Sequence, residues 1–108
     1  LQSIAGPLRD YLRAREEILM VSGFTDNQPV RVVNGRFADN LELSAQRALT
    51  VARALIDEGM PSSQVFAAAF GAEQPVADNA DEKGRAQNRR VEMAPVPRAT
   101  NAKTIAHE

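Results

Sequence analysis

The chain has 108 residues, of which 44% are hydrophobic and 25% are charged, a composition typical of one ordinary globular domain. Its 13 basic and 14 acidic residues leave a net charge of −1, which argues against the strongly basic surface of a nucleic-acid-binding domain. The absence of cysteine excludes a disulfide scaffold and thiolate zinc sites. No apolar run approaches the roughly 20 residues of a membrane span, and the basic flank of a signal peptide is missing at Leu1. We therefore expect a piece of a longer protein, with any membrane anchor or export signal upstream.

The first part of the chain is predicted to form a helix, a strand and a long loop. Pro7 suits the first turn of a helix, and apolar residues follow it at helical spacing, which predicts a helix over residues 7–15. Residues 18–21 form a short apolar run ended by Gly23, as in a buried strand. Residues 27–39 contain proline and glycine and are predicted to be a loop, whose length is typical of functional or mobile segments.

A second helix is predicted from Asn40, which looks like an N-cap, to the residue before Gly59. One side of this helix is apolar at a spacing of about 100° per residue. A second buried strand follows over residues 65–70. Residues 72–83 are predicted to be an acidic loop and residues 84–89 at most a short helical turn.

Residues 90–96 are predicted to be the last strand, with Val91 and Met93 on one face. The pattern indicates an α+β fold, an α/β sandwich with helices packed on one face of a mixed sheet. The strands at 18–21 and 65–70 should be parallel, whereas the short connection before Arg90 favours an antiparallel last strand. We expect one domain over residues 1–97 and a disordered tail over residues 98–108, where periodicity ends.

Three segments, in order and at suitable distances, carry a resemblance to a known family. They are Thr25-Asp26-Asn27, Asn40 to Ala48 (N-L-E-L-S-A-Q-R-A) and Gly84 to Val91 (G-R-A-Q-N-R-R-V). Over roughly residues 8–96 the chain resembles the OmpA/MotB-type peptidoglycan-binding domain. The long loop and residues 35–44 are most similar to flagellar stator B subunits, although these commonly have tryptophan where this chain has Leu41. The resemblance implies an OmpA-like βαβαβ-type fold with a further strand before the first helix. We expect this strand to be absent here unless residues 1–4 are its remnant.

Asp26 and Arg47 are the candidate ligand-binding pair. Arg47 lies beside the apolar stripe of its predicted helix, where its stem can rest on packed surface and its guanidinium can reach a pocket rim. Asp26 follows a strand end, the usual place for ligand groups in such sheets. A carboxylate and a guanidinium on one rim can bind a zwitterion. Spacing alone predicts only a rim capable of ion pairing, and a structural salt bridge of Arg47 with Asp26 or Asp39 stays open.

The resemblance implies that the ligand is meso-diaminopimelate of peptidoglycan stem peptides, with its ammonium at Asp26 and its carboxylate at Arg47. The ligand-binding set that we expect is Thr25, Asp26, Asn40, Leu43, Ser44, Arg47, Arg89 and Arg90. We expect one of the last two arginines to support the pocket or contact stem-peptide carboxylates and the other to be solvated. Phe24 stands where the family usually has histidine.

Catalysis, cofactors and metals are not expected. The only histidine, His107, lies in the predicted tail, so Ser44 lacks a positioned base. The acidic residues of the 72–83 loop lack the spacing of a calcium site. Arg85, Arg89 and Arg90 are not expected to bind nucleic acid, because no aromatic residue is interleaved with them.

The favoured function is that of a non-catalytic module that anchors an envelope protein to the cell wall. The resemblance implies a periplasmic domain of a stator subunit, held in the inner membrane, working as a homodimer beside a stator partner subunit. Two alternatives stay open. One is a structural dimerisation module in which Arg47 only stabilises the fold, and the other is an outer-membrane OmpA/Pal-type wall tether.

Overall fold

The computed structural model describes residues 4–30 and 37–98. Its elements are α1 (Ala5–Arg15), β1 (Glu17–Phe24), α2 (Asn40–Asp57), the 3₁₀ turn η1 (Ser62–Gln64), β2 (Val65–Gly71), α3 (Glu82–Asn88) and β3 (Arg90–Pro97). The predicted disordered tail lies, from residue 99 on, outside the described residues, as does the middle of the predicted long loop. None of the helices within the described ranges is long and apolar enough to cross a membrane.

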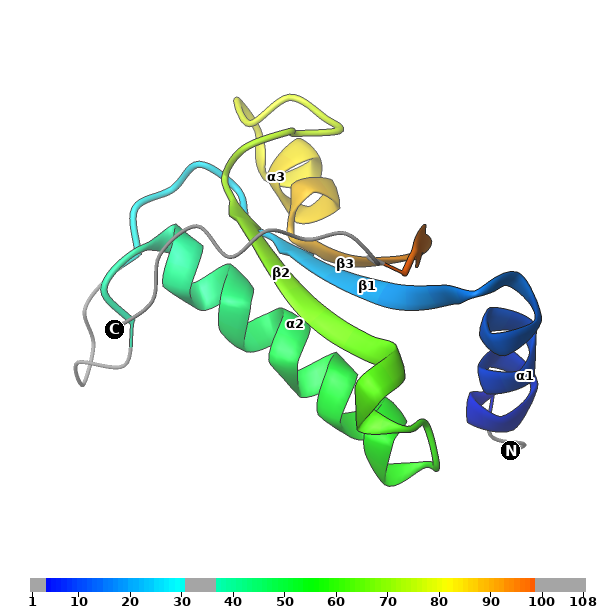
Figure 1. Cartoon of the computed structure of the whole chain (residues 1–108). Coiled ribbons are helices and arrows are strands. Elements are labelled where there is room, and N and C mark those ends of the chain that lie inside the picture. The colour runs from blue at the N-terminus through cyan, green and yellow to red at the C-terminus, as the bar shows by residue number, and fades with distance from the viewer. Residues whose placement is uncertain (1–3, 31–36, 99–108) are drawn as a thin grey trace, which may run out of the picture.

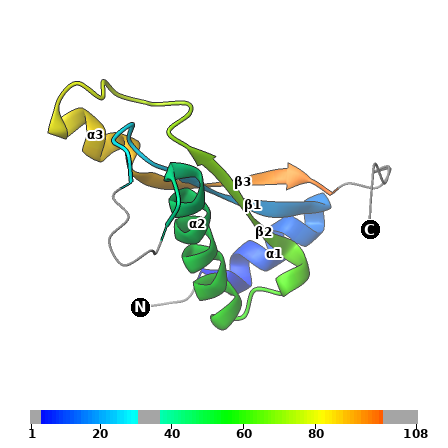
Figure 2. The ribbon, with the colours of Figure 1, turned by 90° about the vertical axis from the view of Figure 1, so that its left-hand side faces the viewer.

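The three strands form one mixed sheet in the order β2-β1-β3 (Figure 1). β1 is parallel to β2 and antiparallel to β3, as predicted. Phe24, at the end of β1, is opposite Gly71 of β2 and Arg90 of β3. The residues that follow β1 therefore emerge where β2 ends and β3 begins. Figure 2 shows that α3 lies at this end of the sheet and α1 at the other.

No strand precedes α1 in the described part of the chain. Ile4 occupies the N-cap position of α1, so it does not belong to a strand, and residues 1–3 are not among those described. α1 begins at Ala5, slightly earlier than predicted. The alternative that residues 1–4 are a remnant of the first strand is therefore wrong for Ile4.

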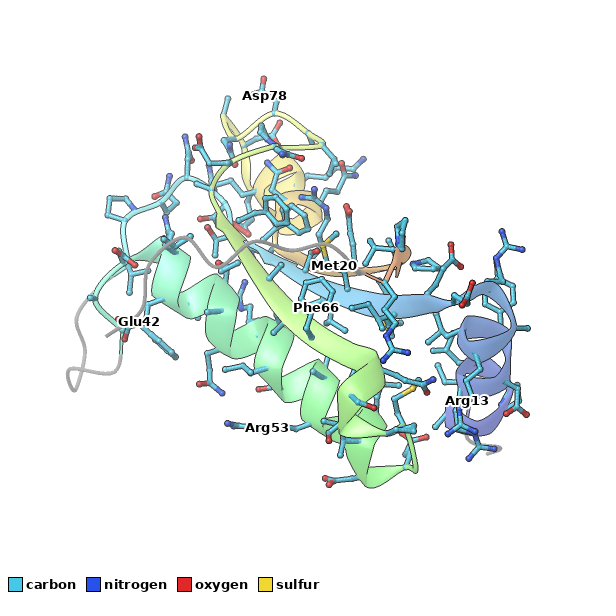
Figure 3. The ribbon with its side chains drawn as sticks, in the orientation of Figure 1. Arg13, Met20, Glu42, Arg53, Phe66 and Asp78 are labelled. Atoms are coloured by element: carbon cyan, nitrogen blue, oxygen red, sulfur yellow. The ribbon has the colours of Figure 1, made fainter. Side chains whose placement is uncertain are left out.

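The core lies between α2 and one face of the sheet. Leu19 and Val21 of β1 alternate toward this face and are 2% and 0% exposed. They pack with buried residues of α1, α2, the following turn and β2, namely Ala5, Leu12, Ala48, Ala52, Leu55, Met60 and Val65. Met20 and Phe66 are opposite each other in register and lie on the other face of the sheet (Figure 3). α1 and α2 thus pack on one face, as predicted, whereas α3 lies at the end of the sheet.

Two helix starts differ from the sequence prediction. Asp39, not Asn40, caps α2, because its Oδ1 accepts a hydrogen bond of 2.8 Å from the Glu42 N–H, and Asn40 is the first helical residue. α3 is a helix of seven residues rather than a short turn starting at Gly84. Its cap is Asp81, whose Oδ1 accepts from the Gly84 N–H at 2.7 Å. The first error arises because Asp39 and Asn40 are equally good caps and only the folded geometry selects one.

Candidate functional site

Asp26 is held in a fixed conformation just beyond β1. The Thr25 N–H donates to the Gly71 carbonyl at 2.8 Å, and the Thr25 hydroxyl donates to the Asp26 carbonyl at 2.8 Å. The Gln28 N–H donates to Asp26 Oδ1 at 2.9 Å. Thr25 and Asp26 are buried, with 4% and 8% exposure. Thr25 therefore holds the backbone in place, and the hydrogen bond from the Gln28 N–H fixes the orientation of the Asp26 carboxylate.

Asn40 connects the start of α2 to the same turn. Its Nδ2 donates to the Gln28 carbonyl at 3.0 Å and to the Asp26 carbonyl at 3.4 Å. The predicted role of Asn40 as a helix cap is thus wrong. The structure instead uses its amide to hold the Asp26 turn against α2.

Ser44 joins α2 to the end of β2. Its hydroxyl accepts from the Gly71 N–H at 2.9 Å and donates to the Leu41 carbonyl at 2.8 Å. The side chain is fully buried, with 0% exposure. Ser44 therefore belongs to the scaffold of the site rather than to its surface, whereas Leu43 beside it is half-buried.

Arg89 is shared by two carboxylates. Its Nη1 lies 2.7 Å from Asp26 Oδ2, and its Nη2 lies 2.7 Å from Glu82 Oε2. Burial by itself raises the pKa of Asp26, but the hydrogen bonds from Arg89 and from the Gln28 N–H outweigh it and hold this pKa below its ordinary value of 3.8. The hydrogen bond from Arg89 likewise lowers the pKa of Glu82, and the two carboxylates raise the pKa of Arg89. Asp26 and Glu82 are therefore ionised at neutral pH.

Arg90 is held by an aromatic stack and by backbone carbonyls. Its guanidinium carbon lies 3.8 Å from the centre of the Phe24 ring, and Phe24 stacks on Phe70 with the ring centres 4.9 Å apart. Two of its nitrogens donate to the carbonyls of Asn88 and Gln74, at 3.2 Å and 3.1 Å.

The expectation that one of these two arginines is solvated is wrong. The side chains of Arg89 and Arg90 are only 33% and 17% exposed, and both are paired. Phe24, in the place where the family usually has histidine, is buried and forms an apolar support beneath Arg90.

Arg47 differs from both of these arginines. It is half-buried on α2, and within the described ranges it forms no ion pair or side-chain hydrogen bond. The salt bridge to Asp26 or Asp39 that the sequence left open is not present, because Asp26 pairs with Arg89 and Asp39 caps α2. Arg47 follows Asn40 by seven residues, which places the two on the same side of α2, about 10 Å apart along its axis. Arg47, a half-buried residue, thus lies on the side of α2 that also holds the Asp26 turn.

Comparison with known proteins shows the family. The model of the OmpA family matches residues 1–89. The chain belongs to the OmpA family. It is 40% identical over 81 residues to Motility protein B of Bacillus subtilis, which covers 74% of this chain and 30% of that protein. It is also 40% identical over 73 residues to Peptidoglycan-binding protein ArfA of Mycobacterium tuberculosis, which covers 68% of this chain and 21% of that protein.

A solved structure confirms the predicted fold. The C-terminal domain of Helicobacter pylori MotB superimposes with a TM-score of 0.70 at 29% sequence identity, covering 92% of this chain and 77% of that chain. The resemblance to OmpA/MotB-type domains is therefore confirmed for both sequence and fold. The chain spans less than a third of the length of the two curated relatives above.

Asn88 and Glu82 are residues of the candidate site that were not predicted from the sequence, and Asn88 is the one that is buried. Its Oδ1 accepts from the Val76 and Ala77 N–H groups at 2.8 and 3.0 Å, and its Nδ2 donates to the Ala77 carbonyl at 2.9 Å and to Asn79 at 2.8 Å. The side chain is completely buried. It fixes the loop between β2 and α3 and therefore the position of Glu82. Its partners lie 9 to 12 residues upstream, so no periodicity marks it.

A cavity of about 360 Å³ lies at the other end of β1. It is lined by Leu12, Arg13, Glu16, Glu17, Ile18, Ser63, Gln64 and Arg98. None of these residues belongs to the three segments that carry the predicted ligand-binding residues, so we place the candidate site at Asp26 instead. Over residues 4–30 and 37–98, no group of three histidine, cysteine, aspartate or glutamate side chains is arranged to hold a metal ion.

Proposed function

We propose that this OmpA-family domain is a non-catalytic peptidoglycan-binding module that anchors an envelope protein to the cell wall. The observation that carries the proposal is the arrangement of Arg47 and Asp26. Arg47 is half-buried and lacks an ion-pair partner in the described structure, while Asp26 is a buried, ionised carboxylate held against the same side of α2. A site with one cation and one anion suits a zwitterion. The relative named as a peptidoglycan-binding protein supports this choice of ligand.

The ligand that we propose is the free amino-acid centre of meso-diaminopimelate in a stem peptide. Its carboxylate would pair with Arg47 through two parallel N–H groups. Its ammonium would bind Asp26, whose oxygens each accept one hydrogen bond from within the protein. An ionised carboxylate has about four acceptor positions, so acceptor capacity remains for the ammonium.

The parent protein that we propose is a flagellar stator subunit with this domain in the periplasm. The similarity to Motility protein B and to the MotB C-terminal domain supports this assignment. Anchoring of the parent in the inner membrane and contact with a stator partner subunit are part of the same proposal. An OmpA/Pal-type tether of the outer membrane is the second candidate for the parent.

Co-sedimentation of the domain with purified peptidoglycan sacculi tests wall binding. Asp26→Ala and Arg47→Ala should each remain folded and bind at least about tenfold more weakly, because each removes one charge-assisted contact. Arg53→Ala is the matched control, since Arg53 is an exposed arginine on the same helix that points away from the sheet (Figure 3). The control should bind like the wild type. Undiminished binding by both site variants would reject the proposed pocket.

We also propose that the domain self-associates through the free edge of β3, as expected for a homodimer. Arg98, just past β3, donates its N–H to the Glu16 carbonyl. In an antiparallel pair the backbone N–H and C=O groups of alternate residues point to opposite sides of the strand. The backbone groups that point away from β1, to the free edge, are therefore those of Val91, Met93, Pro95 and Pro97. The two prolines carry no N–H. Val91 and Met93 can therefore pair with another strand, and Met93 is 49% exposed.

Light scattering over a range of protein concentrations tests this association. Met93→Pro should shift the protein toward the monomer, because it removes an edge N–H without removing a bond to β1. Met93→Thr keeps the N–H while also removing the apolar side chain, so it should associate more strongly than the proline variant. A strictly monomeric wild type at high concentration, or equal association of the two variants, would show that the β3 edge is not the contact.

A further inference from the structure

Glu82 and Arg89 lie at the two ends of α3 and bind each other, and Arg89 also binds the carboxylate of Asp26. They are separated by seven residues, close to two helical turns, so their side chains lie on one side of the helix. Glu82 Oε2 binds Arg89 Nη2 at 2.7 Å, and Glu82 Oε1 lies 3.4 Å from Nη1. Arg89 Nη1 also binds Asp26 Oδ2 at 2.7 Å. One guanidinium therefore serves an exposed carboxylate and a buried one, whose side chains are 64% and 11% exposed.

Because Arg89 binds two carboxylates, it donates fewer hydrogen bonds to Asp26 than a guanidinium can. A guanidinium and a carboxylate can form two parallel N–H···O bonds, which satisfy both oxygens and neutralise the charge. Here Asp26 receives a single bond from Arg89, because Nη2 is bound to Glu82. Arg85 also lies beside Glu82, with its Nε 3.5 Å from Glu82 Oε1, so the cluster has two carboxylates and two guanidiniums and no excess charge. What distinguishes Asp26 is therefore the single hydrogen bond that it receives from Arg89.

We propose that Glu82 is a positioning residue that keeps Asp26 able to accept an ammonium group, by holding the second nitrogen of Arg89. This inference rests on the proposed function, in which Asp26 binds the ammonium of diaminopimelate. Glu82 acts without touching the ligand. When residue 82 is neutral, both Nη1 and Nη2 of Arg89 can donate to Asp26, and they then compete with the ammonium for the same carboxylate oxygens.

The competing explanation is that Glu82 only stabilises α3. A glutamate in the first turn of a helix interacts favourably with the helix dipole, and exposed ion pairs contribute little to stability. That role predicts a small change in unfolding and no change in ligand affinity. Affinity for the ligand therefore separates the two explanations.

The experiment is a titration of the full chain with meso-diaminopimelate, followed by calorimetry or NMR, at 0.15 M salt. Glu82→Gln should weaken binding about threefold. The effect is expected to be small because Glu82 is exposed and salt screens its interaction with Arg89. Glu58→Gln makes the same change of charge at the far end of α2 and should bind like the wild type. In an Arg89→Gln background the additional Glu82→Gln change should have no effect, because Glu82 acts only through Arg89.

A second measurement reports on Asp26 itself. The carboxyl carbon of Asp26, followed by NMR in the ligand-free protein, should show a pKa lowered further in Glu82→Gln, because Arg89 then pairs with Asp26 alone. Loss of the Glu82 charge alone would lower this pKa equally with and without Arg89, whereas the proposed role requires the larger shift when Arg89 is present.

The outcomes separate failure of this inference from failure of the proposed function. If Asp26→Ala abolishes binding while Glu82→Gln binds like the wild type, the role of Glu82 is rejected and the binding site stands. An equal loss from Glu82→Gln with and without Arg89 would mean that Glu82 acts directly by its charge, which also overturns the inference. If Asp26→Ala binds as well as the wild type, the proposed function itself fails.

Discussion

Replacing Gly23 by alanine should separate α2 from the sheet and abolish binding to sacculi. A Cβ atom at Gly23 would lie 2.0 Å from the carbonyl oxygen of Ser44 and 2.9 Å from its carbonyl carbon. These are backbone atoms of α2 and cannot rotate away, so the helix must move. That movement would strain the hydrogen bond between the Ser44 hydroxyl and the Gly71 N–H. We expect a loss of stability at or above the upper end of the about 1–3 kcal/mol typical of overpacked cores.

Urea unfolding followed by circular dichroism measures this effect. Gly6→Ala is the matched control, because a Cβ at Gly6 meets no atom within 4 Å and the residue lies in α1. The control should be neutral or slightly more stable, since alanine favours a helix over glycine by up to about 1 kcal/mol. Equal stability of Gly23→Ala and the wild type would mean that α2 does not approach β1 as closely as described.

Hydrophobic patterning accounts for much of what the sequence predicted correctly. The runs at 18–21 and 65–70 correspond to β1 and β2, and the apolar stripe after Asn40 corresponds to α2. The relative directions of the strands follow from connection length and were also correct. These features depend on the spacing of apolar residues and on connection length, both of which can be read from a single sequence.

The candidate site was predictable only in part. Asp26 lies, as expected, beyond a strand end, and Arg47 is half-buried on α2. The pairing of Asp26 with Arg89, however, joins residues 63 positions apart and depends on where α3 sits. Ser44 also has a different place from the expected one, because its hydroxyl is consumed by contacts between α2 and β2. Polar side chains have several satisfactory partners in principle, and only the assembled fold selects among them.

Replacing Asn88 by alanine should destabilise the domain by about 1–3 kcal/mol and loosen the loop between β2 and α3. The change leaves the Val76 and Ala77 N–H groups and the Ala77 carbonyl without their partner. A buried group left without a partner costs about 1–3 kcal/mol, but Val76 is exposed and Ala77 is half-buried, so water can satisfy part of what is lost. Because this loop places Glu82 and the start of α3, binding to sacculi should also weaken.

Amide hydrogen exchange and urea unfolding together measure this prediction. The amides of Val76 and Ala77 should exchange faster in Asn88→Ala, whereas those of β1 should lose protection only as far as global stability falls. Gln87→Ala, an exposed neighbour on the same helix, is the control and should leave both measurements unchanged. Asn88→Asp keeps the two acceptor contacts but directs a carboxylate at the Ala77 carbonyl, so near neutral pH it should destabilise the domain through repulsion rather than through lost acceptors. Unchanged exchange at Val76 and Ala77 in the alanine variant would show that the loop is held by other contacts and that Asn88 does not position the site.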